Sequence, residues 1–184
     1  RTLFALIRLV RPHNAAAAAL SAAAGHLLAG GAWPPAALLW GTALVTAAGN
    51  VINDVYDRDI DLINKPGRPL PSGATTPRAA VVLYALLLAG AAGTALLLPV
   101  SAAVWLLAWA LLLHLYSARL KRVFVAGNLL VAAVSASGFL LGAFLAGRLV
   151  AGAVPACFTF AFVLARELVK DCEDEEGDAA CGAR

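Results

Sequence analysis

Long apolar blocks alternate with polar connectors along almost the whole chain. Each block has roughly the 17–25 residues that an α-helix needs to cross a bilayer. We expect six such helices, over residues 13–31, 36–56, 79–98, 101–118, 126–147 and 149–169. Because no connector is long enough to hold a soluble domain, the pattern predicts an all-α transmembrane bundle that forms a single domain over residues 1–184.

The first eleven residues have a different pattern, in which apolar residues alternate with Arg1, Arg8 and Arg11. The three arginines fall on roughly one face of a helix, as in helices that lie in the membrane interface. We therefore expect an interfacial helix that leads into the first span, and no cleavable signal peptide.

Composition agrees with a membrane protein. Of the 184 residues, 61% are hydrophobic and 14% are charged, whereas about a quarter of the residues of a soluble domain are charged. The net charge of +3 does not indicate a nucleic-acid partner, because the basic residues flank apolar spans and form no separate basic module. The three cysteines have no metal-site spacing, and a disulfide framework is not expected.

The basic residues orient the predicted bundle. All lysines and arginines except Arg148 fall on the N-terminus, the even-numbered connectors or the C-terminal tail. Positive charge favours the cytoplasmic side of a membrane. We therefore expect an integral protein of the cell membrane whose N-terminus and longer connectors are cytoplasmic.

The acidic residues are confined to two windows, 54–61 and 167–178, and all 11 of them lie there. Both windows fall at the cytoplasmic ends of spans, after the second and the sixth. A solvated surface would scatter acids over every loop. We therefore expect two acidic clusters that face each other across the bundle.

The first window has a four-residue spacing. Asn53, Asp57 and Asp61 would line one face of a continuing helix, with Asp54 at its edge. Like charges at this spacing repel, and Mg²⁺ relieves the repulsion because it prefers oxygen ligands. The alternative is a solvated helix end with ordinary capping acids, although acids near a helix C-terminus oppose the helix dipole.

The loop over 64–73 follows, and its three prolines and two glycines predict a shaped turn. It holds Lys65 and Arg68 near the carboxylates. Both are candidates for contacts with phosphate oxygens, and both also fit a purely topological role as cytoplasmic positive charge.

The second window repeats the spacing at Asp174 and Asp178, with Asp171 beside them, and Arg166 and Lys170 extend the same face backward. Such a face suits a metal-bound diphosphate, whose oxygens attract cations and whose metal takes carboxylates. The alternative is a polar tail with paired charges. Further candidates lie on the second, fourth and fifth spans or in the connector after the fourth: Asn50, Tyr116, Lys121, Arg122 and Asn128. The last of these also fits a packing hydrogen bond between helices.

These residues resemble the signatures of a known family. The run Asn53-Asp54-x-x-Asp57-x-x-x-Asp61, followed by Asn64-Lys65-Pro66-Gly67-Arg68-Pro69-Leu70-Pro71-Ser72-Gly73, resembles the first signature of the UbiA superfamily of intramembrane prenyltransferases. The run Asp171-x-x-Asp174-x-x-Gly177-Asp178 resembles the second. The stretches 166–174 and 116–122 look most like the geranylgeranylglyceryl-phosphate geranylgeranyltransferase group of ether-lipid synthesis.

The resemblance implies a bundle of nine spans, of which six are present here, so the chain is expected to be C-terminally incomplete. It also implies Mg²⁺-dependent transfer of a geranylgeranyl group from its diphosphate to a prenylglyceryl phosphate. Asp57, Asp61, Asp174 and Asp178 would be the catalytic carboxylates. With Asn53, Asp54 and Asp171 they would hold the metal, and six basic residues would bind the diphosphate: Lys65, Arg68, Lys121, Arg122, Arg166 and Lys170.

Three alternatives remain open. A transferase of the same superfamily can act on an aromatic or chlorophyllide acceptor. Intramembrane acids also mark ion paths in cation transporters, although transport sites tend to lie near the midplane. The third alternative is that the chain is an inactive fragment.

Overall fold

The computed structural model describes residues 2–123 and 125–173, and every regular element in this part of the chain is helical. The α-helices are α1 Thr2–Val10, α2 Pro12–Leu28, α3 Ala36–Tyr56, α4 Arg58–Asn64, α5 Pro77–Ala95, α6 Val100–Ala118, α7 Ala126–Leu145 and α8 Ala153–Glu173. Two 3₁₀ turns, η1 Leu120–Arg122 and η2 Leu149–Gly152, precede α7 and α8. The all-α prediction is therefore confirmed.

Five of the six expected spans are long and apolar enough to cross a membrane: α3, α5, α6, α7 and the segment Leu149–Lys170 that contains α8. The expected span over 13–31 is shorter, because α2 ends at Leu28 and Gly30 follows with a φ of 82°. The helix of 17 residues nevertheless belongs to the bundle, because it packs against both α3 and α7.

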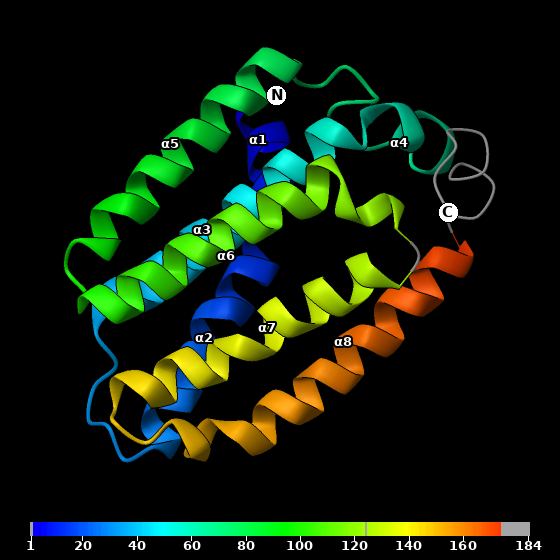
Figure 1. The fold of residues 1–184 in the computed structure, drawn as a ribbon. Coiled ribbons are helices and arrows are strands. Elements are labelled where there is room, and N and C mark those ends of the chain that lie inside the picture. The colour runs from blue at the N-terminus through cyan, green and yellow to red at the C-terminus, as the bar shows by residue number, and fades with distance from the viewer. Residues whose placement is uncertain (1, 124, 174–184) are drawn as a thin grey trace.

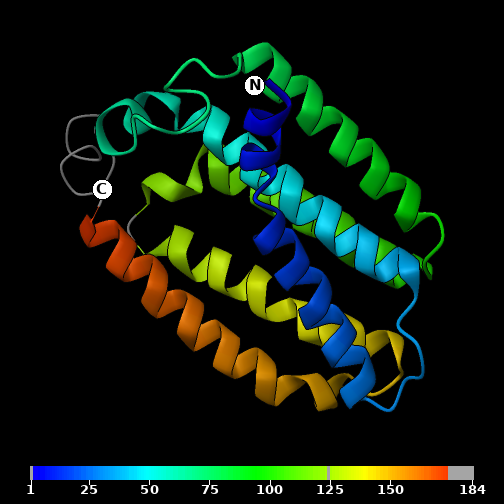
Figure 2. The ribbon, with the colours of Figure 1, turned by 180° about the vertical axis from the view of Figure 1, so that it is seen from behind.

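The helices form a bundle whose two edges are α5 and α8 (Figures 1 and 2). Helix α3 packs against α5, α2 and α6, and α7 packs against α2, α6 and α8. The last turn of α3, the short helix α4 and the C-terminal end of α8 lie at the same end of the bundle (Figure 1). The two acidic windows therefore begin at one end, as expected.

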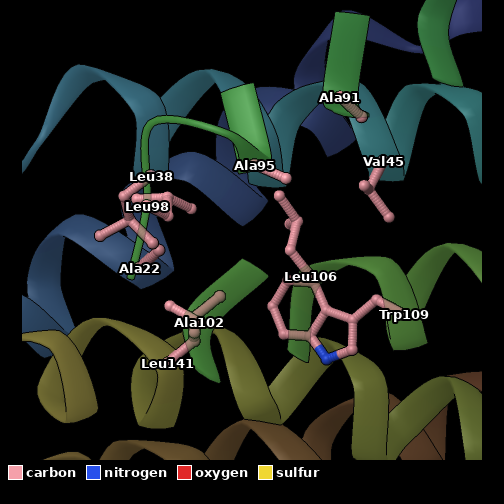
Figure 3. Packing of buried hydrophobic residues seen from close by; sticks show 10 residues of the cluster. All are labelled: Ala22, Leu38, Val45, Ala91, Ala95, Leu98, Ala102, Leu106, Trp109 and Leu141. Atoms are coloured by element: carbon pink, nitrogen blue, oxygen red, sulfur yellow. The ribbon is translucent and has the colours of Figure 1, made fainter. Parts of the chain in front are cut away.

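The core is built where α3, α5 and α6 meet (Figure 3). Leu106 and Trp109 of α6 are buried beside Val45 of α3 and Ala91 and Ala95 of α5. Small residues allow the backbones of α2 and α7 to come into contact. A Cβ atom at Gly142 would overlap the carbonyl oxygen of Ala22, so the backbones touch at this crossing.

The segment that we expect to lie in the membrane interface forms helix α1. Its residues Leu3, Phe4 and Ile7 are exposed, whereas Leu9 is fully buried in a second apolar cluster with Val51, Leu70 and Ala80. That cluster joins α1 to α3, to the loop after α4 and to α5. The N-terminal helix is thus anchored over the end of the bundle that holds the first acidic window.

The prediction of an uninterrupted helix through the first window is wrong at one residue. Helix α3 ends at Tyr56, Asp57 is a turn residue, and α4 begins at Arg58. The hydrogen bonds of Asp57 N to Asn53 O (2.9 Å) and of Asp61 N to Asp57 O (2.8 Å) continue across the break. On the two sides of this break, Asp57 and Asp61 have different basic partners, described next.

Candidate active site

Two carboxylates of the first window are buried against arginines. Asp54, 3% exposed, forms an ion pair with Arg11, and its Oδ1 lies 3.5 Å from the Arg68 guanidinium. Arg68 also donates a 2.6 Å hydrogen bond to Asp61, which is equally buried. Burial raises the pKa of the Asp61 carboxyl, and the hydrogen bond and charge of Arg68 oppose that rise. One guanidinium thus joins α3 to α4.

The loop between α4 and α5 supplies this arginine because its own hydrogen bonds fold it back. Arg68 N donates to Lys65 O and Ser72 N donates to Arg68 O, each at 3.0 Å. Gly73, with a φ of 71°, adopts the left-handed conformation that few other residues tolerate. Arg8 of α1 adds a 3.3 Å hydrogen bond to Gly67 O. The expectation of a shaped turn is confirmed.

Asp57 has a different set of partners. Its Oδ1 accepts from Lys121 of η1, and its Oδ2 accepts from the Asn53 side-chain amide at 2.6 Å. The Lys121 ammonium also lies 6.0 Å from the centre of the Tyr56 ring, within the range of a cation–π contact. The connector after α6 therefore meets the first window directly.

The side chain of Asn53 has an oxygen to spare. Its amide nitrogen is used by Asp57, whereas its buried Oδ1 has no hydrogen-bond partner among the described residues. A buried polar atom without a partner costs about 1–3 kcal/mol. Mg²⁺ takes oxygen ligands of this kind, so this orphaned oxygen beside carboxylates fits a divalent cation.

A cavity of about 440 Å³ opens next to these residues, between α2, α3, α6, α7 and α8. Polar side chains line it where the helices reach the acidic end of the bundle, among them Arg11, Asn50, Asn53, Arg68 and Tyr116. Further along the same helices the lining becomes largely apolar: Trp109, Leu113, Val131, Val134 and Phe162. A ligand with a charged head and an apolar tail fits this change in lining.

Helix α8 brings a second charged group to the cavity. Glu167, 4% exposed, accepts from Arg166 at 2.8 Å and from Lys170 at 3.1 Å, and all three residues line the cavity. The predicted α8 face therefore reaches the same cavity as Asn53 and Arg68.

The structure distributes the remaining sequence-predicted residues unevenly. Lys65 is half-buried at the end of α4, and Asn128 is buried in α7, but neither lines the cavity. Asp54, Asp57, Asp61 and Lys121 are likewise not among the residues that line the cavity. The side chains of Arg122 and Asp171, and the whole of Asp174 and Asp178, lie outside the described residues. Within residues 2–123 and 125–173, no three His, Cys, Asp or Glu side chains converge on one point.

Sequence reasoning missed two charged residues at the cavity. It assigned Arg11 only to membrane orientation, yet Arg11 pairs with Asp54 and lines the cavity. Its position directly before Pro12, between two helical patterns, was the available signal. Glu167 was left without a role, although its spacing from Arg166 and Lys170 places it on their face of α8.

Comparisons with known proteins agree with this geometry. The sequence profile of the UbiA prenyltransferase family matches residues 15–184. A curated protein of Methanoculleus marisnigri, named digeranylgeranylglyceryl phosphate synthase, is 45% identical over 184 residues, which cover 98% of this chain and 66% of that protein. The chain thus spans slightly less than two thirds of the relative's length.

Solved structures give the same picture. One reported for digeranylgeranylglyceryl phosphate synthase in membranes has a TM-score of 0.83 and 31% identity, over 99% of this chain and 67% of the other. A UbiA homologue of Archaeoglobus fulgidus, bound to DMAPP and Mg²⁺, has a TM-score of 0.68 and 24% identity over 97% of this chain and 66% of its own. The second likeness concerns the fold.

Proposed function

The chain belongs to the UbiA prenyltransferase family. On this premise we propose that the protein transfers the geranylgeranyl group of geranylgeranyl diphosphate to a prenylglyceryl phosphate. The observation that carries the proposal is the cavity of about 440 Å³, whose lining changes from charged side chains to apolar ones. An isoprenoid diphosphate has the same division between its head and its tail. The curated relative at 45% identity carries the name of this activity.

Mg²⁺ is the metal that the donor set fits. Asn53, Asp57 and Asp61 would hold it from the first window, with Asp54 as a close helper, and Asp171, Asp174 and Asp178 would contribute from the second. When bound, Mg²⁺ neutralises negative charge that builds up on a diphosphate leaving group. The buried Asn53 Oδ1 supports this assignment, because it has no hydrogen-bond partner among the described residues and is therefore available to a metal ion.

The basic residues prepare the head of the cavity for the diphosphate. Arg68 presents a planar guanidinium that can contact two phosphate oxygens at once, and its links to Asp54 and Asp61 fix its position. Lys121 would approach from η1, where Asp57 holds it. Lys65 and Arg122 would complete the positive surroundings that stabilise the departing diphosphate.

The apolar lining has a second task. When the bond between the prenyl C1 and the diphosphate oxygen breaks, an allylic cation remains, and water would capture it. Trp109, Leu113 and Val134 surround that part of the cavity with side chains that exclude water. The acceptor hydroxyl then attacks C1 and loses its proton.

The site is proposed to face the cytoplasm. Arg8, Arg58, Lys65, Arg78 and Arg119 lie at the end of the bundle that holds the site, whereas Arg148 lies at the other end. This distribution of positive charge is typical of a cytoplasmic face.

The test compares two acids of one window in protein expressed from the full coding sequence. Asp57→Ala is expected to abolish Mg²⁺-dependent release of diphosphate, because it removes a metal ligand and the partner of Lys121. Asp59→Ala is the matched control: Asp59 is exposed, lies outside the cavity lining, and is not a proposed ligand. Near-normal turnover of Asp57→Ala would contradict the proposal.

Acceptor identity needs its own measurement. Purified protein is offered geranylgeranylglyceryl phosphate, a hydroxybenzoate or a chlorophyllide with the same donor, and the products are separated by mass. Prenylation of the lipid phosphate alone is the expected result. Prenylation of an aromatic acceptor, or ion flux in liposomes without any prenyl substrate, would favour the other functions that the sequence left open.

A further inference from the structure

The proposed reaction has to hold two anions in one cavity. The donor carries a diphosphate that leaves, and the acceptor carries a phosphate that stays in the product. The two groups need separate places, because both are present when the new C–O bond forms.

Two separate groups of cations line the cavity. Arg11 and Arg68 are joined to Asp54 at the end of α3, beside Asn53. Arg166 and Lys170 are joined to Glu167 on α8. No ion pair among the described residues connects the two groups, although both line the same cavity.

The α8 group is centred on a buried carboxylate, and the side chains of Arg166 and Lys170 that flank it are 59% and 36% exposed. Glu167 is 4% exposed and receives one hydrogen bond from each cation. A buried carboxylate needs such compensation, and in return it holds the two cations together. The charges of Arg166, Lys170 and Glu167 add to a net charge of about +1 at the cavity. The guanidinium and the ammonium retain further N–H donors for an oxyanion.

The same face of α8 continues as an apolar wall. Thr159, Phe162 and Val163 precede the charged group by one or two turns and line the cavity as well. A lipid lying along this face would place its chain against Phe162 and Val163 and its charged head at Arg166 and Lys170. The donor head, by contrast, is drawn to Asn53 and Arg68 on the opposite wall.

On the basis of the proposed function, we propose that Arg166 and Lys170 bind the phosphate of the lipid acceptor, with Glu167 as the residue that positions them. This separates them from the cations that serve the donor diphosphate. The acceptor is thereby recognised as a phosphate monoester on an apolar chain, and the α8 face sets that specificity.

The test measures the KM for each substrate in protein from the full coding sequence. Arg166→Gln and Lys170→Gln are each expected to raise the KM for geranylgeranylglyceryl phosphate by about tenfold or more, the loss of one charge-assisted contact. The KM for geranylgeranyl diphosphate should stay unchanged. Each single variant leaves Glu167 with one cation, and Arg166→Lys should recover much of the loss because it restores the charge.

An acceptor without the phosphate, geranylgeranylglycerol, is the decisive partner in this experiment. Wild-type protein should prefer the phosphorylated acceptor, and both variants should lose most of that preference. Arg78→Gln, an exposed arginine at the start of α5, is the matched control and should keep it. A rise in the donor KM with an unchanged acceptor preference would overturn the proposal.

Failure of the proposed function gives a different result. Wild-type protein that transfers no prenyl group to either acceptor contradicts the function itself. Equilibrium binding of radiolabelled geranylgeranylglyceryl phosphate then decides the inference separately. Weaker binding by Arg166→Gln than by wild type supports the phosphate site, and equal binding overturns it.

Discussion

Arg11, at the junction of α1 and α2, forms an ion pair with Asp54, 43 residues later in the last turn of α3. Arg11 reaches this partner from a left-handed backbone conformation, with a φ of 51°. An L-residue other than glycine adopts it at a cost of about 1–2 kcal/mol. The ion pair therefore anchors the N-terminal helix to the first acidic window against a local backbone cost.

Replacing Arg11 separates these two effects. Arg11→Ala should destabilise the protein by about 2 kcal/mol, below the 3–5 kcal/mol typical for a broken buried pair, because Arg68 still lies 3.5 Å from Asp54. Arg11→Gly loses the same charge but relieves the backbone, and should be about 1 kcal/mol more stable than Arg11→Ala. Thermal unfolding in detergent measures the order. Equal melting temperatures for Gly and Ala would show that the backbone at residue 11 carries no strain.

Asn53 is expected to trade stability against activity. Asn53→Leu loses the 2.6 Å hydrogen bond to Asp57 but also removes the unpartnered Oδ1. The two contributions, each of about 1 kcal/mol, nearly cancel in the free energy of unfolding. Mg²⁺-dependent transfer should nevertheless fall by at least roughly 10–100-fold, the loss typical of changing a residue that only supports a metal ligand. A variant with wild-type turnover across a Mg²⁺ titration would remove Asn53 from the ligand set.

How far the sequence predicts this protein depends on the range of each interaction. Hydrophobic period and length predict the helices, because burial in lipid acts along each segment independently. Spacing predicts that Asn53 and Arg68 belong to one site, since both lie within one short stretch of chain.

The contacts that sequence reasoning missed join distant segments. The pairing of Arg11 with Asp54 depends on how α1 packs over α3, and Asp57 pairs with Lys121, 64 residues away. The periodicity of the sequence around Arg11 or Asp57 does not predict either of these distant partners. Burial of Glu167 follows from the packing of α8 against α7 and also escapes a residue-by-residue pattern.

A polar pair between α5 and α6 gives another prediction. The Tyr84 hydroxyl lies 3.0 Å from His114 Nδ1, and the His114 ring meets the edge of Tyr56, which lies beneath Lys121. Tyr84→Phe should cost about 0.6 kcal/mol, the average of hydrogen bonds between membrane helices. A double-mutant cycle with His114→Leu measures the coupling. Additive changes in melting temperature would show that the pair contributes nothing jointly.

The close crossing of α2 and α7 predicts a strong effect from a single methyl group. A Cβ atom at Gly142 would overlap the carbonyl oxygen of Ala22, which is rigid helix backbone and cannot turn aside. Gly142→Ala must therefore push the two helices apart, at a cost of about 1–3 kcal/mol. Because the cavity lies between these helices, the separation should also weaken binding of the prenyl tail.

Gly93 of α5 provides the matched control. It is exposed on the outer edge of the bundle, and a Cβ atom there would meet nothing within 4 Å. Gly93→Ala should leave the melting temperature unchanged or raise it, because alanine favours a helix by up to about 1 kcal/mol over glycine. Thermal unfolding of the two variants in one detergent decides the matter. If Gly142→Ala has the same melting temperature as Gly93→Ala, the backbones of α2 and α7 do not touch at this crossing.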